Sequence, residues 1–289
     1  MPELPEIYVF CQQMTATIMG KEIEKAAILQ TKCLNRPEND YQRLAGKKIE
    51  KVEPLGKWIK ITLHSKDELL INLGMGGELI YFTDISDIPA KAKFIVSFTD
   101  GTGFFVTLWW FGYFHFIKAG EKNPMTDNLG EDPLHLSLDQ FKLKLAGKRG
   151  RIKSFLLDQK NCRGIGNFYI QEILFQAKLH PQRPIDSLTT QEIKKLYHAI
   201  QQVFRRSIEL GSSSYEKDFF GKYGDYSLKE LSFAYEKDAV CPDCGTATQK
   251  IKTGTNAQYI CPICQQLPGG KNTIINNFRQ LEIHKTGKE

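Results

Sequence analysis

The sequence predicts an α+β protein in which a strand-rich amino-terminal part precedes a helical part and a small β-hairpin that carries four cysteines. Residues 20–118 contain short alternating or β-rich runs separated by turn residues, which is typical of an antiparallel sandwich or barrel. From residue 137 to 210 the apolar residues instead recur at a helical period. Beyond them lie two Cys-x-x-Cys pairs, at residues 241–244 and 261–264.

The amino-terminal part begins with a predicted helix over residues 7–18, with Pro5 just before it. The last strand-like run, residues 104–117, contains polar residues and is shorter than the roughly 18 residues that span a bilayer. No basic segment precedes an apolar core at the start, as a secretory signal requires. We therefore expect an intracellular protein without a membrane partner. Strands are expected in the runs KKIEKVEPLG, WIKITLHS, ELLINLG, ELIYFTD, KFIVSFTD and GFFVTLWWFGYFHFI.

The helical part follows a break at Asp132-Pro133. Residues 211–227, GSSSYEKDFFGKYGDYS, have no period and many small or flexible residues, so they form a predicted loop. Loops of this length are usually either functional or disordered. Capping preferences predict helices from Ser137, over residues 151–160, over residues 169–177, and from Thr190 with Glu192 in its first turn.

The composition excludes some functions without selecting one. Lysine and arginine number 39 against 33 aspartates and glutamates, and this net charge of +6 is compatible with nucleic acid but common in other enzymes. A length of 289 residues suggests about two domains. The chain has no GxxxxGK[ST], GxSxG or HExxH pattern, so nucleotide hydrolysis, serine hydrolysis and zincin chemistry have no support. No nucleotide cofactor is expected.

The paired cysteines are candidate ligands of one structural Zn²⁺. Their 16-residue spacer lies in the range of such sites, and four thiolates supply a tetrahedral set. One alternative is two disulfides, which a reducing compartment disfavours. The other is a redox-active Cys-x-x-Cys pair, which is disfavoured because the chain has two matching pairs. The spacer alternates, with Gly254 and Asn256 midway, and predicts a β-hairpin. The expected ligands are Cys241, Cys244, Cys261 and Cys264.

The segment RGIGN at residues 163–167 is a candidate anion site between two predicted helices. Its glycines allow tight turns, Asn167 can cap the next helix, and backbone N–H groups at a helix start suit a phosphate. An ordinary helix–turn–helix connection is the simpler interpretation of the motif alone. A basic cluster just upstream is typical either of a nucleic-acid surface or of a solvated face. Its members are Lys142, Lys144, Lys148, Arg149, Arg151 and Lys153.

Taken together, the motifs of this chain resemble those of the formamidopyrimidine-DNA glycosylase and endonuclease VIII family of base-excision repair enzymes. The resemblance covers nearly the whole chain and rests on the order and spacing of the motifs. They are PELPE (2–6), LGK (55–57), LGM-x-G (73–77), LDQ (157–159), GIGN-x-Y-x-x-E (164–172), Pro181 with Arg183, F-x-Y (233–235), and the cysteine pairs closing with Gln265.

The resemblance implies a fold with DNA in the groove between two halves. An antiparallel β-sandwich flanked by helices would be joined to a helix-two-turn-helix domain with a zinc finger. The expected divisions are a catalytic sandwich domain over residues 1–130, a helix-two-turn-helix domain over 131–235, a zinc finger over 236–267 and a polar tail over 268–289.

The resemblance also implies a catalytic role for Pro2, whose secondary amine becomes the chain terminus when Met1 is removed. An α-amine has a pKa of about 7.7–8.0, so part of it is neutral and nucleophilic near neutral pH. Pro2 would attack C1′ and form a Schiff base, and β- and δ-elimination would cut the strand. Glu3 would be the general acid and base, with Glu6 supporting it, and Lys57 would hold a phosphate. By itself, PELPE indicates only a stiff helix start.

The implied partner is double-stranded DNA with damaged bases or abasic sites, bound by a monomer. The target nucleotide must leave the duplex before its C1′ can be reached, and Met75 would fill the gap. Further DNA contacts are expected from Asn167, Trp109, Phe111, Asn256 and Lys153.

Three positions depart from the family pattern. Trp109 stands where the glycosylase branch has an arginine that reads the opposite base, so stacking would replace charged hydrogen bonds and opposite-base preference would flatten. The alternative places Trp109 in the sandwich core beside Trp110. Asn72 replaces a histidine, and Asn256 replaces, by spacing, an arginine that grips a phosphate.

Two functions follow from these residues. The first is an active DNA glycosylase that also cuts the strand at the abasic site, and the second is a damage-binding protein with weak catalysis. Retention of Pro2, Glu3 and Lys57 favours the first, because a pure binder needs no amine chemistry. The missing arginines at 109 and 256 keep the second open.

Overall fold

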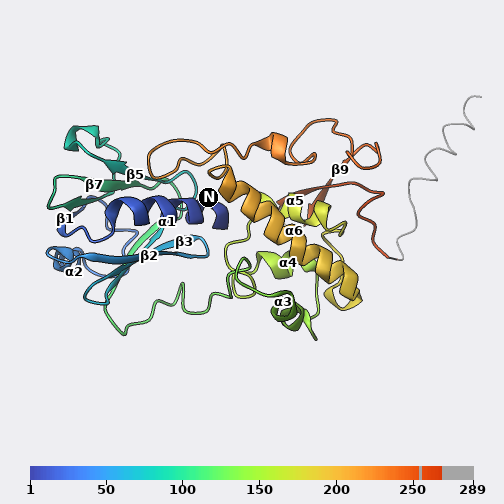
Figure 1. Ribbon diagram of the computed structural model, residues 1–289, viewed down its shortest axis with the longest axis horizontal. Coiled ribbons are helices and arrows are strands. Elements are labelled where there is room, and N and C mark those ends of the chain that lie inside the picture. Colours follow the sequence, from blue (N-terminus) through green and yellow to red (C-terminus); the bar gives the residue numbers. More distant parts are fainter. Residues whose placement is uncertain (254–255, 269–289) are drawn as a thin grey trace, which may run out of the picture.

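The structure, a computed structural model, describes residues 1–253 and 256–268 and has two parts that lie side by side (Figure 1). A β-sandwich forms one end, and helices with a β-hairpin form the other. Helix α1 (Leu4–Ile18) runs along the sandwich, and its start reaches the helical part. Residues 254–255 lie outside the described residues, as does all but the first residue of the predicted tail 268–289.

Within residues 1–253, two four-stranded antiparallel sheets face each other. Of the sandwich and the barrel that the sequence predicts as alternatives, the sandwich is therefore the one observed. Side chains alternate between the two faces of each strand, as in β6, where Phe94, Val96 and Phe98 are buried. The inner faces make one core. One sheet has the order β1 (Ile23–Ile28), β6 (Phe94–Phe98), β7 (Gly103–Thr107), β5 (Glu78–Phe82), and the other β2 (Ile49–Leu55), β3 (Trp58–Leu63), β4 (Glu68–Asn72), β8 (Tyr113–Ile117).

Helix α1 contributes to both hydrophobic cores of the molecule. Ile7 and Phe10 pack into the sandwich core, whereas Leu4 packs into the core of the helical part. The helix starts earlier than predicted, because the Glu6 carboxylate accepts the Glu3 N–H (2.8 Å) and a proline is tolerated in the first turn. The first residues of the chain are therefore held at the junction of the two parts.

The helices predicted after residue 137 are all present. Ile173 of α5 and Leu196 of α6 lie in their shared core. Thr189 caps α6, one residue before the predicted Thr190, and its hydroxyl accepts the Glu192 N–H at 3.2 Å. No described helix has the length and apolar character needed to cross a membrane. The helices are α3 (Leu138–Leu145), α4 (Ile152–Leu157), α5 (Tyr169–Gln176) and α6 (Thr190–Glu209), with short helices α2 (Glu38–Tyr41), η1 (Gln42–Leu44), η2 (Ile85–Asp87), η3 (Ile185–Ser187) and η4 (Leu228–Glu230).

Strands β9 (Gln249–Thr253) and β10 (Asn256–Ile260) pair antiparallel and form the hairpin predicted between the cysteine pairs. The hairpin is attached to α5 through Gln171, whose amide accepts the Tyr259 N–H (3.1 Å) and donates to the Ala257 carbonyl (3.3 Å). The Gln265 amide donates to the Leu179 carbonyl at 2.9 Å. These bonds fix the cysteine-bearing hairpin to the helical part.

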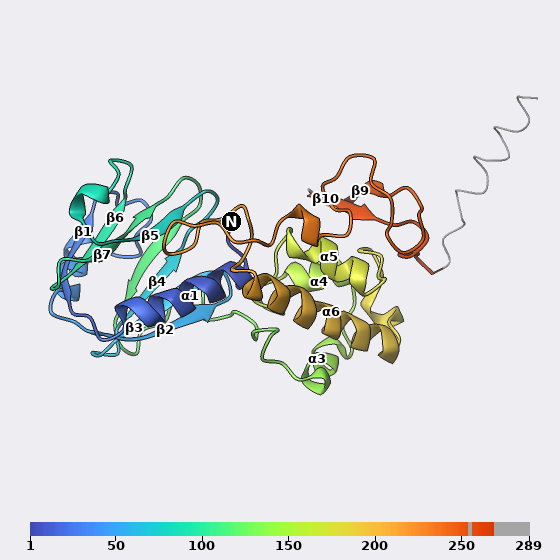
Figure 2. The same cartoon turned by 45° about the horizontal axis from the view of Figure 1, so that its top comes forward.

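The predicted loop, residues 211–227, is ordered and is here called the strap. It leaves the helical part and crosses back to the sandwich (orange in Figure 2). Phe219 is fully buried in the sandwich core, its N–H donates to Gln13 Oε1 (2.9 Å), and its carbonyl accepts the Tyr81 N–H (2.8 Å). The sequence left this loop either functional or disordered, and the structure shows that disorder is wrong.

Replacement of Phe219 by alanine should release the strap from the sandwich. Loss of a buried phenylalanine costs about 3–5 kcal/mol of unfolding free energy, and we expect faster proteolysis within residues 211–227. Urea unfolding and limited proteolysis measure the two effects. Phe220→Ala, at a side chain that is 46% exposed, is the matched control. Equal losses of stability in the two variants would contradict this assignment.

Candidate active site

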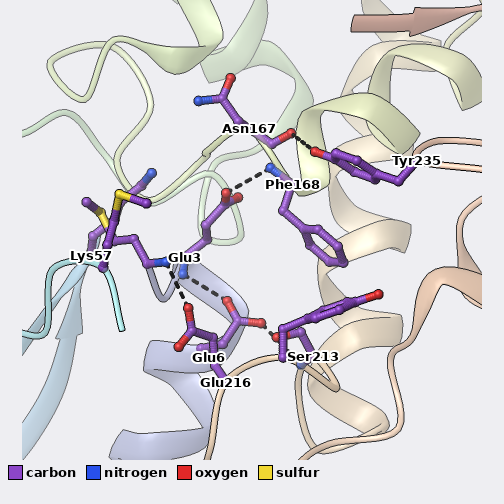
Figure 3. A pocket seen from close by; sticks show the side chains of 11 residues that line it. Glu3, Glu6, Lys57, Asn167, Phe168, Ser213, Glu216 and Tyr235 are labelled. Carbon is purple, nitrogen blue, oxygen red and sulfur yellow. Dashed lines mark hydrogen bonds and ion pairs between the residues drawn. The ribbon is translucent and has the colours of Figure 1, made fainter. Parts of the chain in front are cut away.

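A cavity of about 390 Å³ lies where the two parts meet (Figure 3). Lys57, Glu3 and Glu6 occupy one side of it, and Phe168 and Tyr235 the other. Charged groups and aromatic rings thus face a shared space. The lining residues are Met1, Glu3, Glu6, Lys57, Met75, Asn167, Phe168, Ser213, Tyr215, Glu216 and Tyr235.

The Glu3 carboxyl group is buried, with the residue only 6% exposed. Its Oε1 accepts the Phe168 N–H at 3.0 Å, while Oε2 has no hydrogen-bond partner in the described part of the chain. Burial raises the pKa of Glu3, and the nearby Lys57 ammonium opposes that shift. A carboxyl group with a raised pKa and an unpaired oxygen can exchange a proton with a molecule in the cavity.

The glycines of the RGIGN segment allow it to approach the start of the chain closely. The Gly164 carbonyl accepts the Leu4 N–H at 3.0 Å. A Cβ on Gly166 would lie 2.1 Å from Glu3 Oε1 and 2.5 Å from Lys57 Nζ. Gly166 therefore leaves the space that both side chains occupy.

The predicted anion site at the start of α5 is filled by the protein itself. The residue that caps α5 is Phe168, and its N–H binds the Glu3 carboxylate. The expectation that Asn167 caps this helix is wrong, although Asn167 lines the cavity. A carboxylate favours a helix N-terminus for the same electrostatic reason as a phosphate.

Asn72 connects the two turns that present Lys57 and Met75. Its side-chain amide donates to the Lys57 carbonyl (2.8 Å), and its carbonyl oxygen accepts the Gly74 N–H (3.0 Å). Asn72 is buried, so both bonds are shielded from water. This asparagine positions both turns at the cavity.

Glu6 supports the site from below the cavity. Its carboxylate accepts the N–H groups of Glu3 (2.8 Å) and Ser213 (3.2 Å) and the hydroxyl of Tyr169. Burial is the main cause that raises the pKa of Glu6, to about 7. Glu6 thus ties α1, α5 and the strap together.

The terminal ammonium of Met1 forms an ion pair with Glu216 of the strap at 2.8 Å. Pro2 is buried directly behind it, and while Met1 is present its nitrogen is part of a peptide bond. Removal of Met1 would take one side chain out of the cavity lining and leave Glu216 without this partner. The catalytic role of Pro2 stays a prediction.

Trp109, Trp110 and Phe111 form an exposed aromatic tip beside Met75. They are 83%, 59% and 60% exposed, so the alternative that Trp109 lies in the sandwich core is wrong. The Met75 N–H donates to the Trp110 carbonyl at 2.8 Å, and the Trp110 and Phe111 rings stack with centroids 5.1 Å apart. A Cβ on Gly76 would lie 2.8 Å from the Trp109 ring, so that glycine makes room for the indole.

The predicted basic cluster does not form a single free surface. Lys142 pairs with Asp139 at 2.9 Å, and Lys144 pairs with Glu131. Lys153 is only 4% exposed, and burial lowers its pKa. A DNA contact by Lys153 stays a prediction, as does one by Asn256, whose side chain lies outside the described part of the structure.

The four paired cysteines converge on one point. Their sulfur atoms all lie within 4.8 Å of one another, with 3.8 Å between Cys241 and Cys264 and 3.5 Å between Cys244 and Cys261. Zinc–sulfur bonds of about 2.3 Å in a tetrahedron place sulfurs about 3.8 Å apart. All four are free thiols, so two disulfides are not present, and the cluster can hold a metal ion.

Sequence reasoning did not place the aromatic and strap residues of the cavity. Tyr235 belongs to the F-x-Y motif and Phe168 occupies the unspecified position of GIGN-x-Y, whereas Ser213, Tyr215 and Glu216 belong to a predicted loop. The dense aromatic and small residues of that loop were the available signal, but only tertiary contacts decide which of them face the cavity.

Comparison with protein families and curated proteins gives matches over most of the chain. The N-terminal domain of formamidopyrimidine-DNA glycosylase matches residues 1–114, and the H2TH domain of the same protein matches residues 129–218. The formamidopyrimidine-DNA glycosylase of Enterococcus faecalis is 31% identical over 278 residues, covering 93% of this chain and 99% of that protein. The Bacillus cereus protein of the same name is 30% identical over 276 residues, with 92% and 99% coverage.

Solved structures show the same relationship. The MutM (Fpg) protein from Thermus thermophilus superposes with a TM-score of 0.80 at 25% identity, covering 91% of this chain and 98% of that one. Lactococcus lactis Fpg in complex with abasic-site DNA superposes with a TM-score of 0.82 at 26% identity, covering 91% and 99%. The likeness therefore includes both parts of the fold.

The raised pKa of Glu6 predicts a specific pH dependence of stability. A carboxyl group whose pKa is about 7 in the folded protein and about 4.5 when unfolded contributes stability below pH 4.5 that is lost as pH rises through 7. The full loss is about 3 kcal/mol, at 1.36 kcal/mol per pKa unit. Urea unfolding at pH 5 and pH 8 should show a loss that is larger in the wild type than in Glu6→Gln by about 2–3 kcal/mol, because the variant cannot ionise at residue 6 but keeps Glu3 with its raised pKa. Equal losses in both proteins would refute it.

Proposed function

The chain belongs to the formamidopyrimidine-DNA glycosylase family, and from this membership we propose that it excises damaged bases from double-stranded DNA and then cuts the strand at the abasic site. The main support from this chain is the buried Glu3 carboxyl group, which lines the same cavity as Lys57 and whose Oε2 has no hydrogen-bond partner in the described structure. Such a group suits proton transfer to a sugar oxygen, as an opening ribose ring requires.

We propose that Pro2 is the nucleophile once Met1 has been removed. The Pro2 nitrogen attacks C1′, the bond from C1′ to the base breaks, and the base leaves. Glu3 protonates the ring oxygen as the sugar opens, which gives an iminium on Pro2. The iminium acidifies the 2′ hydrogens, so elimination first expels the 3′ phosphate and then the 5′ phosphate. The ammonium of Lys57 would hold a phosphate beside the lesion.

The proposed partner is duplex DNA with damaged bases or abasic sites, bound across the junction by a monomer inside the cell. Met75 and Asn167 line the cavity, and Trp109 and Phe111 project from the tip beside it, so these four suit contacts with an opened duplex. Contacts by Lys153 and Asn256 belong to the same proposal without support from the described side chains.

We also propose that the cysteine cluster holds one structural Zn²⁺, with Cys241, Cys244, Cys261 and Cys264 as ligands. The thiol donors and their separations fit a tetrahedral zinc site. The proposed domain limits remain 1–130, 131–235, 236–267 and 268–289, with the hairpin as part of the finger.

The alternative, a damage-binding protein with weak catalysis, is not favoured. Burying a carboxyl group with an unpaired oxygen costs stability, and groups buried at such a cost are typical of catalytic sites, whereas a binder has no use for one. The cavity around Glu3 and Lys57 is better explained by catalysis.

Borohydride reduction tests the proposed chemistry. With a duplex containing an abasic site, the Met1-free protein should form a covalent complex that mass spectrometry assigns to Pro2, because reduction converts the iminium to a stable amine. Pro2→Gly, which keeps an α-amine, is the matched variant and should be trapped more slowly. Trapping at a lysine in the wild type, or no trapping, would refute the assignment.

Replacement of a cysteine tests the proposed metal. Cys261→Ser should release the zinc and weaken DNA binding, while the sandwich, which has its own core, stays folded. Metal analysis and DNA titration measure both effects. Cys33→Ser, which lies outside the cluster, is the control and should keep its zinc. Wild-type protein purified without zinc would rule this site out.

Trp109 should affect affinity for DNA more than discrimination between opposite bases. An indole stacks on any base, at about 1–3 kcal/mol per base, but has only one N–H donor for a base edge. We expect Trp109→Ala to weaken binding about tenfold or more, and Trp109→Arg to introduce opposite-base discrimination that the wild type lacks. Binding titrations with one lesion opposite each of the four bases measure this, with Trp110→Ala as control. Strong discrimination by the wild type would contradict it.

A further inference from the structure

The strap places the carboxylate of Glu216 in the active-site cavity, where it meets the start of the chain (Figure 3). It forms an ion pair with the terminal ammonium of Met1 at 2.8 Å, and its side chain is only 19% exposed. Within the described residues, this ammonium is its one ion-pair or hydrogen-bond partner. A positively charged nitrogen therefore already occupies the space in front of this carboxylate.

Removal of Met1, which the proposed chemistry of Pro2 requires, takes this partner away. A carboxylate that is largely shielded from water costs stability unless a positive charge or hydrogen-bond donors meet it. The Met1-free protein therefore presents a carboxylate that suits a positively charged ligand.

The cavity as a whole has more acidic than basic side chains. Among the described residues that line it, Glu3, Glu6 and Glu216 supply carboxyl groups, whereas Lys57 supplies the one basic side chain. Glu3 and Glu6 already accept backbone N–H groups, and Lys57 is proposed to hold a phosphate. Glu216 is thus the carboxylate that is left to meet a base in the cavity.

Aromatic rings form the other wall of the cavity. The Phe168 and Tyr235 rings are nearly parallel, at 17°, with centroids 6.2 Å apart, and Phe168 contacts the Tyr215 ring at 5.7 Å (Figure 3). The Tyr235 hydroxyl donates to the Asn167 carbonyl at 3.1 Å, so this polar group already has a partner. The faces of such rings attract cations, and aromatic walls are a common means of holding positively charged organic groups.

We propose that Glu216 selects purine bases with a fixed positive charge, such as guanine methylated at N7 with both rings intact, and that these bases are substrates. This inference rests on the function proposed above. The flipped-out base stacks on the aromatic wall and pairs with Glu216 in place of the Met1 ammonium. The charge of the base, and not its alkyl group, is what this site selects.

The positive charge also determines which step Glu216 assists. The neutral Pro2 amine forms its bond to C1′, and the electron pair of the bond from C1′ to N9 stays on N9, so the base leaves as a neutral molecule. The N–H proton of the amine passes to Glu3 and from there to the ring oxygen as the sugar opens, which leaves the iminium on Pro2. Because the charge of the base disappears as this bond breaks, the ion pair with Glu216 aids capture of the base rather than the chemical step.

Duplexes with a base that cannot be released test capture without catalysis. One contains N7-methylguanine on a 2′-fluorinated sugar, which resists loss of the base, and the other contains the 7-deaza counterpart, which has the same shape without the charge. Equilibrium titrations with the Met1-free full-length protein give a Kd for each. Glu216→Gln removes the carboxylate, and Glu38→Gln, at an exposed glutamate of α2, is the control that removes the same charge elsewhere.

The wild type and Glu38→Gln should bind the charged analogue about tenfold more tightly than the neutral one, because a charge-assisted contact is gained. Glu216→Gln should bind the two analogues equally. With N7-methylguanine on an ordinary sugar, the wild type should release the base faster than it is lost spontaneously, and Glu216→Gln should change KM more than kcat.

Equal affinity of the wild type for the two analogues, or a preference that persists in Glu216→Gln, would overturn the inference. Release of N7-methylguanine no faster than its spontaneous loss would do the same. A Glu216→Gln variant that slows cleavage at an abasic site while keeping the preference would assign Glu216 to the Pro2 amine instead. If the wild type cleaves duplexes with neither an abasic site nor a ring-opened guanine, the proposed function fails, and the titrations, which need no cleavage, judge the Glu216 site separately.

Discussion

A buried carboxyl group at the start of the chain connects the two parts of this protein. Glu3 lies at the N-terminus of α5, where its Oε1 accepts the Phe168 N–H and its Oε2 remains unpaired within the described structure. Burying a carboxyl group is costly, and here the helix start and the Lys57 ammonium offset part of that cost. Buried carboxyl groups with a raised pKa are typical of functional sites, and Glu3 lines the cavity at the junction of the two parts.

The surrounding structure is arranged to hold that carboxyl group. Helix α1 contributes Leu4 to one hydrophobic core and Phe10 to the other, so the first residues cannot shift without disturbing both. Asn72 fixes the turn of Lys57, and Glu6 fixes the backbone of Glu3 from below. The strap adds Ser213, Tyr215 and Glu216 to the lining of the cavity. The candidate active site is therefore formed by both parts of the protein at their junction.

Much of this fold was predictable from local patterns, whereas the details of the site were not. Alternation in β6 and capping at Ser137 are local signals, and the strands and helices they predict are present. The cap of α5 was predicted incorrectly because the anion that satisfies its start comes from Glu3, far away in sequence.

Exposure also depends on tertiary structure. The aromatic run around Trp109 has the composition of a core strand, and only its turn beside Gly76 exposes it. Similarly, Phe219 and Glu216 belong to one loop, but the first enters the sandwich core and the second the active-site cavity. The family resemblance made Glu3 and Lys57 candidate residues because their motifs are short and contiguous, and both line the cavity. The strap has no such motif.

Replacement of Gly166 by alanine tests whether catalysis depends on the close approach of this residue to Glu3 and Lys57. The atoms nearest the added Cβ belong to the ends of these two side chains, Glu3 Oε1 at 2.1 Å and Lys57 Nζ at 2.5 Å, so the fold should tolerate the change while both groups are displaced. Single-turnover base release should fall about a hundredfold, the cost of a misplacement of about 1 Å. Gly147→Ala, at a positive φ with open space around it, should cost stability and leave the rate unchanged. Wild-type rates in a folded Gly166→Ala protein would show that catalysis does not depend on this close approach.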